Sequence, residues 1–133
     1  MKILFICKYN RFRSKVAEAY FKKINKNKKI KISSAGLIKG KPTPLNTITI
    51  AKRFGINLKK TTNPIIEKDI EKIDLIIITA NNIPLSLFRN YKSKIIKWKI
   101  LDANANDNKN IIKSIKLIMN KIEKLVKKLE KEK

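Results

Sequence analysis

The feature that most constrains the fold is a short polar turn between an apolar strand and an amphipathic helix, close to the start of the sequence. The run Ile3-Leu4-Phe5-Ile6 predicts a buried strand, and apolar residues recur at helical spacing from Val16 to Ile24. Between them lies Cys7-Lys8-Tyr9-Asn10-Arg11-Phe12-Arg13-Ser14. A turn at a helix N-terminus offers unpaired backbone N–H groups, which with the helix dipole stabilise an anion or a thiolate. The sequence therefore predicts an anion-binding turn beside Cys7.

Cys7 is the only cysteine, and there is no histidine. One cysteine excludes a disulfide framework and a Cys-x-x-Cys motif, which favours a cytoplasmic location. The absence of histidine excludes a His-assisted triad and a zinc site with imidazole ligands. Any activation of Cys7 must therefore come from backbone dipoles, hydroxyl groups and arginine. A buried cysteine that merely ends a strand is the alternative interpretation.

Strand and helix patterns alternate along the chain, and its 133 residues suit a single domain over residues 1–133. Strands are predicted at Lys2–Ile6, Lys29–Ser33, Asp74–Thr79 and Ile96–Leu101. Helices are predicted at Ser14–Asn25, at Leu45–Phe54, near Pro84–Arg89 and from about Asn108 to Glu130. Strands that are apolar on both faces and separated by helices indicate an α/β fold, with three layers (α/β/α) and a four-stranded parallel sheet. No signal peptide or membrane span is expected.

In such sheets, ligands bind beyond the carboxyl ends of the strands. Cys7 and Asp102 each follow a predicted strand, so we expect them at the same edge of the sheet. Asp107 lies in the same Asn-rich segment and is a second candidate acid. We prefer Asp102 because Asn106-Asp107-Asn108 is typical of a helix N-cap. A helix cap or a simple loop charge is the alternative for Asp102.

The motif Cys7-x5-Arg13-Ser14 directly after the first strand resembles the phosphate-binding loop of the low-molecular-weight protein tyrosine phosphatase family. Shorter matches to that family follow in the expected order along nearly the whole chain: Val16-Ala17-Glu18, Ser34-Ala35-Gly36, Gly40-Lys41-Pro42, Gly55-Ile56-Asn57 and Asp102. The resemblance implies a phosphatase that hydrolyses phosphate monoesters, possibly protein phosphotyrosine, through a phosphocysteine. It implies no metal and no cofactor.

Three residues are expected to carry the chemistry. Cys7 is the nucleophile, and Arg13 binds two phosphate oxygens bidentately and supports the thiolate. Asp102 lies near the place of the family's general acid, so it would protonate the leaving oxygen and then activate water. Ser14 can hydrogen-bond the sulfur, while the resemblance gives Asn10 the role of holding the loop, with Ser34 as its partner. The expected phosphate-binding and supporting residues are Lys8, Tyr9, Asn10, Arg11, Phe12, Ser14 and Ser34.

The sequence departs from the family at several of these positions. Tyr9 replaces the usual glycine of the loop, and Phe12 replaces a second loop cysteine. The missing thiol argues against the related arsenate reductases, which need several cysteines. Ala103 replaces the proline after the acid, and Asn104 and Ala105 replace the aromatic residues that often follow. A preference for phosphotyrosine therefore does not follow.

The formal net charge is +23, from 33 basic and 10 acidic residues. Such a charge attracts polyanions, either nucleic acid or acidic phosphorylated substrates. Because the lysines are scattered over the three longer predicted helices without interleaved aromatic residues, we favour compositional bias over nucleic-acid binding. The expected partner is a phosphorylated protein or a small phosphate monoester. Two alternatives remain open: a weak or inactive phosphate- or phosphoprotein-binding module, and a basic nucleic-acid-binding protein.

Overall fold

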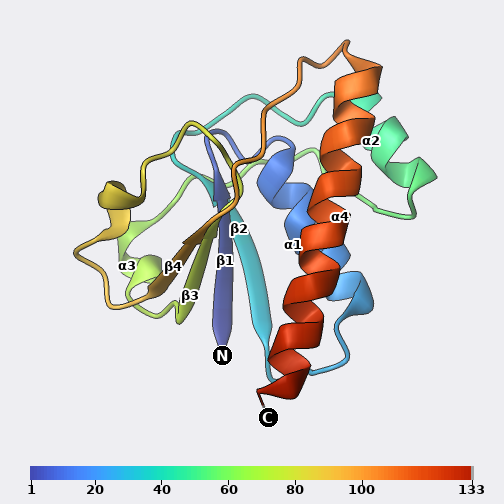
Figure 1. Ribbon diagram of the computed structural model, residues 1–133. Helices are drawn as coiled ribbons and strands as arrows, with labels where there is room; N and C mark the ends of the chain where they lie inside the picture. The colour runs from blue at the N-terminus through green and yellow to red at the C-terminus, as the bar shows by residue number, and fades with distance from the viewer. Residues whose placement is uncertain (133) are drawn as a thin grey trace.

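A parallel sheet lies between two unequal layers of helices in the computed structural model, which describes residues 1–132 (Figure 1). The strands are β1 (Lys2–Cys7), β2 (Lys31–Gly36), β3 (Leu75–Ile78) and β4 (Lys94–Lys97). The helices are α1 (Arg13–Ile24), α2 (Leu45–Arg53), α3 (Glu67–Ile70), the 3-10 helix η1 (Leu85–Phe88) and α4 (Asn108–Lys131). All neighbouring strands are parallel, in the order β2-β1-β3-β4. The predicted α/β/α architecture is confirmed.

The two central strands explain the continuous apolar runs in the sequence. Every residue from Ile3 to Cys7 is buried, and so is every residue of β3. A strand flanked on both sides and covered on both faces has no exposed position for a polar side chain. β4 lies at an edge and is only partly buried.

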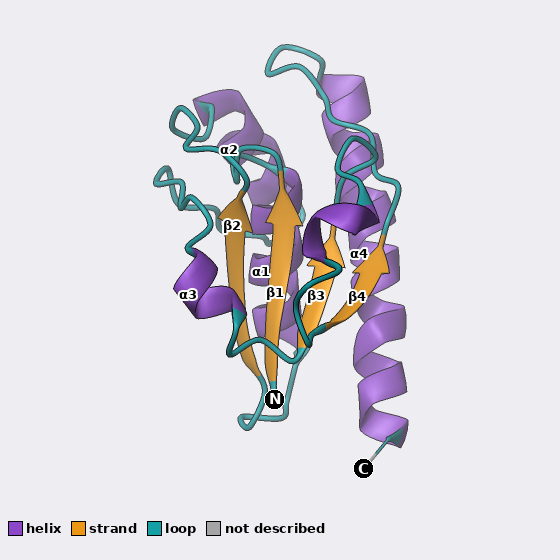
Figure 2. Ribbon diagram, turned by 90° about the vertical axis from the view of Figure 1, so that its left-hand side faces the viewer, coloured by secondary structure: helices purple, strands orange, loops and turns teal. Residues whose placement is uncertain are grey.

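Helices α1 and α4 cover one face of the sheet, and the shorter α3 and η1 lie on the other (Figure 2). The thick layer contains buried side chains from the sheet and both long helices, among them Ile3, Phe5, Ile77, Val16, Phe21, Ile111, Ile115, Ile118 and Ile122. Burying each such side chain contributes about 1.5–3 kcal/mol. The buried isoleucines of α4 therefore anchor that helix to the rest of the fold.

Some predicted boundaries were wrong. The fourth strand is Lys94–Lys97, not Ile96–Leu101, since the chain turns after it, with Ile100 N–H donating to the Trp98 carbonyl at 2.9 Å. Trp98 and Ile100 are buried in the core without belonging to the strand. The second strand extends to Gly36, opposite Cys7. Helix α3 was missed because four residues are too few for a helical period.

Within residues 1–132, no helix is both long and apolar enough to cross a membrane.

Candidate active site

The polar loop after β1 joins the carboxyl end of the strand to the first turn of α1. Cys7 is the last residue of β1, and α1 begins at Arg13. The Cys7 side chain is buried, and its Sγ lies 3.0 Å from the Ser14 Oγ. The first N–H groups of a helix have no intrahelical partner. Cys7 therefore faces a hydroxyl group and lies beside the N-terminus of a helix, where free backbone N–H groups can bind an anion.

The side chain of Asn10 stabilises the conformation of the loop through hydrogen bonds. Asn10 is fully buried and has a φ of 56°, the left-handed conformation that asparagine tolerates better than most residues. Its Nδ2 donates to Ser14 Oγ at 2.8 Å and to Ser34 Oγ at 2.9 Å, while its Oδ1 accepts from Asn63 N–H at 2.9 Å. Ser34 in turn donates to Glu18 at 2.6 Å. The supporting network thus links the loop to α1, to β2 and to the segment that precedes α3.

We predict that Asn10→Gly and Asn10→Ala both destabilise the fold, the alanine variant more. Both remove three hydrogen bonds, two of them buried, and leave their partners unsatisfied, which costs about 2 kcal/mol or more. Only alanine also carries the penalty of a Cβ at positive φ, about 1 kcal/mol. Denaturant unfolding of both variants measures the difference. Equal stability of the two would show that the left-handed conformation is not required.

The Arg13 guanidinium is fixed by residues from distant parts of the chain. Its side chain is 2% exposed, and Nη1 donates to the Ile100 carbonyl at 2.9 Å and to Asn81 Oδ1 at 3.4 Å. Its Nη2 lies 3.7 Å from Asp102 Oδ2. Asn81 and Ile100 follow β3 and β4, so the sheet edge itself orients the cation. Reasoning from the sequence missed both partners, because neither belongs to a recognisable motif.

Asp102 lies beside Arg13 at the same edge of the sheet, although β4 ends five residues before it in the sequence. Its side chain is 54% exposed, and its Oδ1 accepts from Ala103 N–H at 2.9 Å. Asp107 instead caps α4, where its carboxylate accepts from Asn110 N–H at 3.2 Å and from Asn110 Nδ2 at 2.6 Å. Of the two candidate acids, Asp102 is the one that lines the pocket with Cys7.

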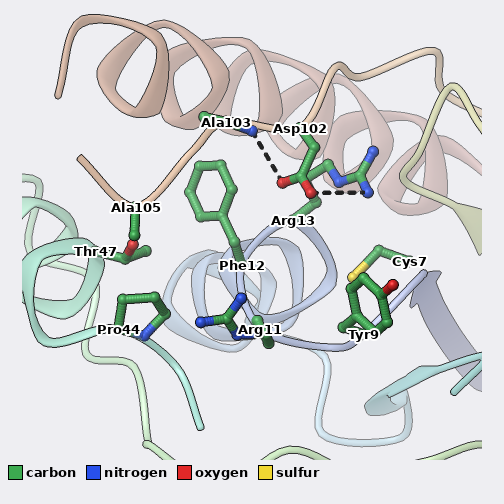
Figure 3. Close-up of a pocket in the computed structure, with 10 residues that line it drawn as sticks. All are labelled: Cys7, Tyr9, Arg11, Phe12, Arg13, Pro44, Thr47, Asp102, Ala103 and Ala105. Atoms are coloured by element: carbon green, nitrogen blue, oxygen red, sulfur yellow. Dashed lines mark hydrogen bonds and ion pairs between the residues drawn. The ribbon is translucent and has the colours of Figure 1, made fainter. Parts of the chain in front are cut away.

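The pocket is a hollow above the loop, with about 410 Å³ of empty space, open solvent included. Figure 3 shows the residues that line it: Cys7, Tyr9, Arg11, Phe12, Arg13, Pro44, Thr47, Asp102, Ala103 and Ala105. Lys8 is not one of them, and its Nζ lies 5.2 Å from the centre of the Tyr9 ring. Ser14, Asn10 and Ser34 lie behind the lining as supports. The pocket therefore combines one thiol, two guanidinium groups and one carboxylate.

Two glycines pack against Tyr9, Gly36 against its backbone and Gly40 against its side chain. A Cβ on Gly36 would lie 2.6 Å from the Tyr9 carbonyl carbon, and one on Gly40 would lie 2.7 Å from the Tyr9 Cβ. Both distances are too short for any larger residue. Among the residues that the structure describes, only Asn10 and Gly55 have a positive φ, so the backbone at Tyr9 does not require glycine. The loop thus closes with an aromatic ring at the pocket wall.

Lys15 is a further cation behind the loop. It is buried, and its Nζ donates to the Lys59 carbonyl at 2.9 Å. Burial lowers the pKa of Lys15 below its ordinary value of 10.5, a change that the charge of Glu18 opposes and that of Lys59 reinforces. The sequence contained no signal for this buried position.

No group of three or more His, Cys, Asp or Glu side chains within residues 1–132 is arranged to hold a metal ion.

The chain is similar to one protein family and to several proteins of known structure. A family model described as low molecular weight phosphotyrosine protein phosphatase matches residues 2–133. A protein tyrosine phosphatase from Entamoeba histolytica is 26% identical, with a TM-score of 0.87 over 98% of this chain and 97% of that chain. The YwlE arginine phosphatase from Geobacillus stearothermophilus is 18% identical, with a TM-score of 0.84 over 98% and 94% of the two chains. An arsenate reductase from Archaeoglobus fulgidus is 23% identical, with a TM-score of 0.74 over 93% and 98%. No curated protein sequence matches the chain.

Proposed function

Since the chain belongs to the low molecular weight phosphotyrosine protein phosphatase family, we propose that it hydrolyses phosphate monoesters through a phosphocysteine formed on Cys7. The observation that carries this proposal is the convergence of Cys7, Arg13 and Asp102 on one pocket at the N-terminus of α1. A phosphoryl group needs a nucleophile, positive charge on its equatorial oxygens and an acid for the leaving group. These three side chains supply one of each.

In the first step, the Cys7 thiolate attacks phosphorus, the S–P bond forms and the ester P–O bond breaks. Arg13 binds two of the equatorial oxygens, with its guanidinium already oriented by the Ile100 carbonyl at 2.9 Å. Backbone N–H groups of the loop stabilise the negative charge on the remaining equatorial oxygen. Asp102 donates its proton to the departing oxygen, which leaves as an alcohol.

In the second step, water attacks the phosphocysteine. Asp102, now ionised, takes a proton from that water, and the S–P bond breaks with both electrons returning to sulfur. The Ser14 hydroxyl, 3.0 Å from the sulfur, stabilises the departing thiolate by hydrogen bonding. Inorganic phosphate is released and the enzyme returns to its starting state.

Hydrolysis is favoured over arsenate reduction by the cysteine count. Reduction of arsenate requires two electrons, which thiols supply by forming a disulfide. Cys7 is the only thiol in the sequence, so this chain cannot form an internal disulfide. Hydrolysis of a phosphocysteine needs no electron transfer and no second thiol.

The substrate is proposed to be a phosphorylated protein or a small phosphate monoester, without a marked preference for phosphotyrosine. Selectivity for a phenyl ring requires aromatic walls at the pocket mouth. Apart from Asp102 itself, the acid segment contributes Ala103 and Ala105 to the lining, so the aromatic side chains of the lining, Tyr9 and Phe12, both belong to the loop and no aromatic residue of the acid segment faces them. We also propose a cytoplasmic location, because a reducing compartment keeps a reactive thiol available.

We predict that the purified protein releases nitrophenolate from para-nitrophenyl phosphate, with equal rates in the presence and absence of a chelator. The mechanism uses only side chains and backbone N–H groups, so removal of metal ions has no effect. Absorbance of nitrophenolate over time measures the rate. A protein that binds inorganic phosphate in calorimetry but releases no nitrophenolate would instead be a phosphate-binding module.

A further inference from the structure

Arg11 is a second guanidinium in the pocket that the proposed mechanism does not use. Its stem lies against Gly40, where a Cβ would be 3.4 Å from the Arg11 Cδ. Its Nε donates to the Pro42 carbonyl at 3.3 Å. These contacts orient the side chain along the pocket wall beside Pro44, as Figure 3 shows. In this conformation Arg11 is one of the residues that line the pocket.

The terminal nitrogens of Arg11 have no partner within the part of the chain that the structure describes: neither a hydrogen bond nor an ion pair involves them. Arg13 differs on this point. Its nitrogens contact Ile100, Asn81 and Asp102, and its side chain is 2% exposed. The one carboxylate of the pocket, Asp102, thus pairs with Arg13 and leaves the charge of Arg11 unbalanced.

On the premise that the chain is a phosphomonoesterase, we propose that its substrates carry a second anionic group near the phosphate ester and that Arg11 binds this group. A carboxylate or a second phosphate has two oxygens at the spacing of a guanidinium fork. Arg13 and the loop N–H groups bind the transferred phosphate, so the second anion would lie against Arg11 at the wall. Pro44, Phe12 and Tyr9 line the same pocket as Arg11, so the carbon skeleton between the two anionic groups of the substrate would lie against apolar side chains.

The test compares matched esters that differ only in charge. The probes are 3- and 4-carboxyphenyl phosphate, each beside its neutral carboxamide, and phosphopeptides with glutamate or glutamine next to the phosphorylated residue. We expect kcat/KM to favour the charged member of a pair by about tenfold to a hundredfold, the contribution of a charge-assisted hydrogen bond. A preference for the charged probe that is seen only among the aryl esters indicates a small-molecule substrate. A preference for the glutamate peptides indicates a protein substrate.

Arg11→Gln is expected to bring that ratio close to one, and Arg11→Lys to retain part of it, because an ammonium keeps the charge but not the fork. Arg53→Gln removes the same charge from the exposed end of α2, outside the pocket, and should leave the ratio unchanged. Using a ratio within each variant cancels any general loss of activity. Equal kcat/KM for charged and neutral probes, or a ratio unaffected by Arg11→Gln, would overturn the inference. Failure of the native protein on para-nitrophenyl phosphate would instead overturn the proposed function.

Discussion

Replacement of Cys7 by serine is expected to abolish hydrolysis of para-nitrophenyl phosphate while phosphate binding persists. A serine hydroxyl does not ionise near neutral pH, so the variant lacks a nucleophile of useful reactivity. The groups that bind the phosphate, Arg13 and the loop N–H groups, are unchanged. The buried sulfur lies 3.0 Å from Ser14 Oγ, and the smaller oxygen fits the same space. Loss of a catalytic nucleophile typically lowers kcat by about 10⁴-fold or more.

The experiment requires two measurements on one preparation. Nitrophenolate release gives turnover, and calorimetric titration with inorganic phosphate gives binding. Cys7→Ala serves as a matched control, because it removes both the sulfur and any hydroxyl at that position. Turnover in Cys7→Ser close to that of the native protein would exclude Cys7 as the nucleophile. Loss of both turnover and binding would mean that Cys7 shapes the loop.

The parts of the site that lie close together in the sequence were predictable from it. β1, the loop and α1 are contiguous, so one motif and two periodicities were enough to locate Cys7 at a helix N-terminus. The long helix α4 was equally predictable from the sequence, because isoleucines recur along its 24 residues. Local spacing determines local structure most reliably where the element is long or the motif is specific.

The contacts that orient the site were not predictable, because they join residues far apart in the chain. Arg13 is held by Asn81 and by Ile100, which lie 68 and 87 residues away. Asn10 depends on Asn63, 53 residues away, whose contribution is a backbone N–H that any residue except proline can supply. Neither the amino-acid composition nor the periodicity of apolar residues indicates a contact between residues so far apart in the sequence.

Asp102 lies in the same pocket as Cys7, although the strand boundary from which that position was predicted is wrong. The sequence placed it directly after a strand, yet β4 ends at Lys97. Trp98 and Ile100 are buried by the core and carry the chain onward to the same sheet edge. Alternating apolar residues here indicated burial correctly, but not the strand, since a buried loop segment has the same pattern.

Asp102→Asn is expected to slow hydrolysis of alkyl phosphates about 10²–10⁴-fold, and that of para-nitrophenyl phosphate much less. An alkoxide leaves only when it is protonated, whereas nitrophenolate is a stable anion that scarcely needs a proton. The relevant readout is the ratio of kcat/KM for the two substrates. Loss of the 3.7 Å contact with Arg13 affects both substrates alike, so that effect cancels in the ratio.

Asp107→Asn provides the matched control, since it makes the same chemical change 5 residues further along the segment. Its carboxylate accepts hydrogen bonds from Asn110 and caps α4, a role that asparagine fills about as well as aspartate, so the substitution should change stability little and leave the ratio unchanged. If Asp107→Asn changes the ratio and Asp102→Asn does not, the two acids exchange roles. If Asp102→Asn slows both substrates equally, its carboxylate orients Arg13 instead of donating a proton. The ratio thus separates proton transfer from positioning, two roles that the geometry of Asp102 allows together.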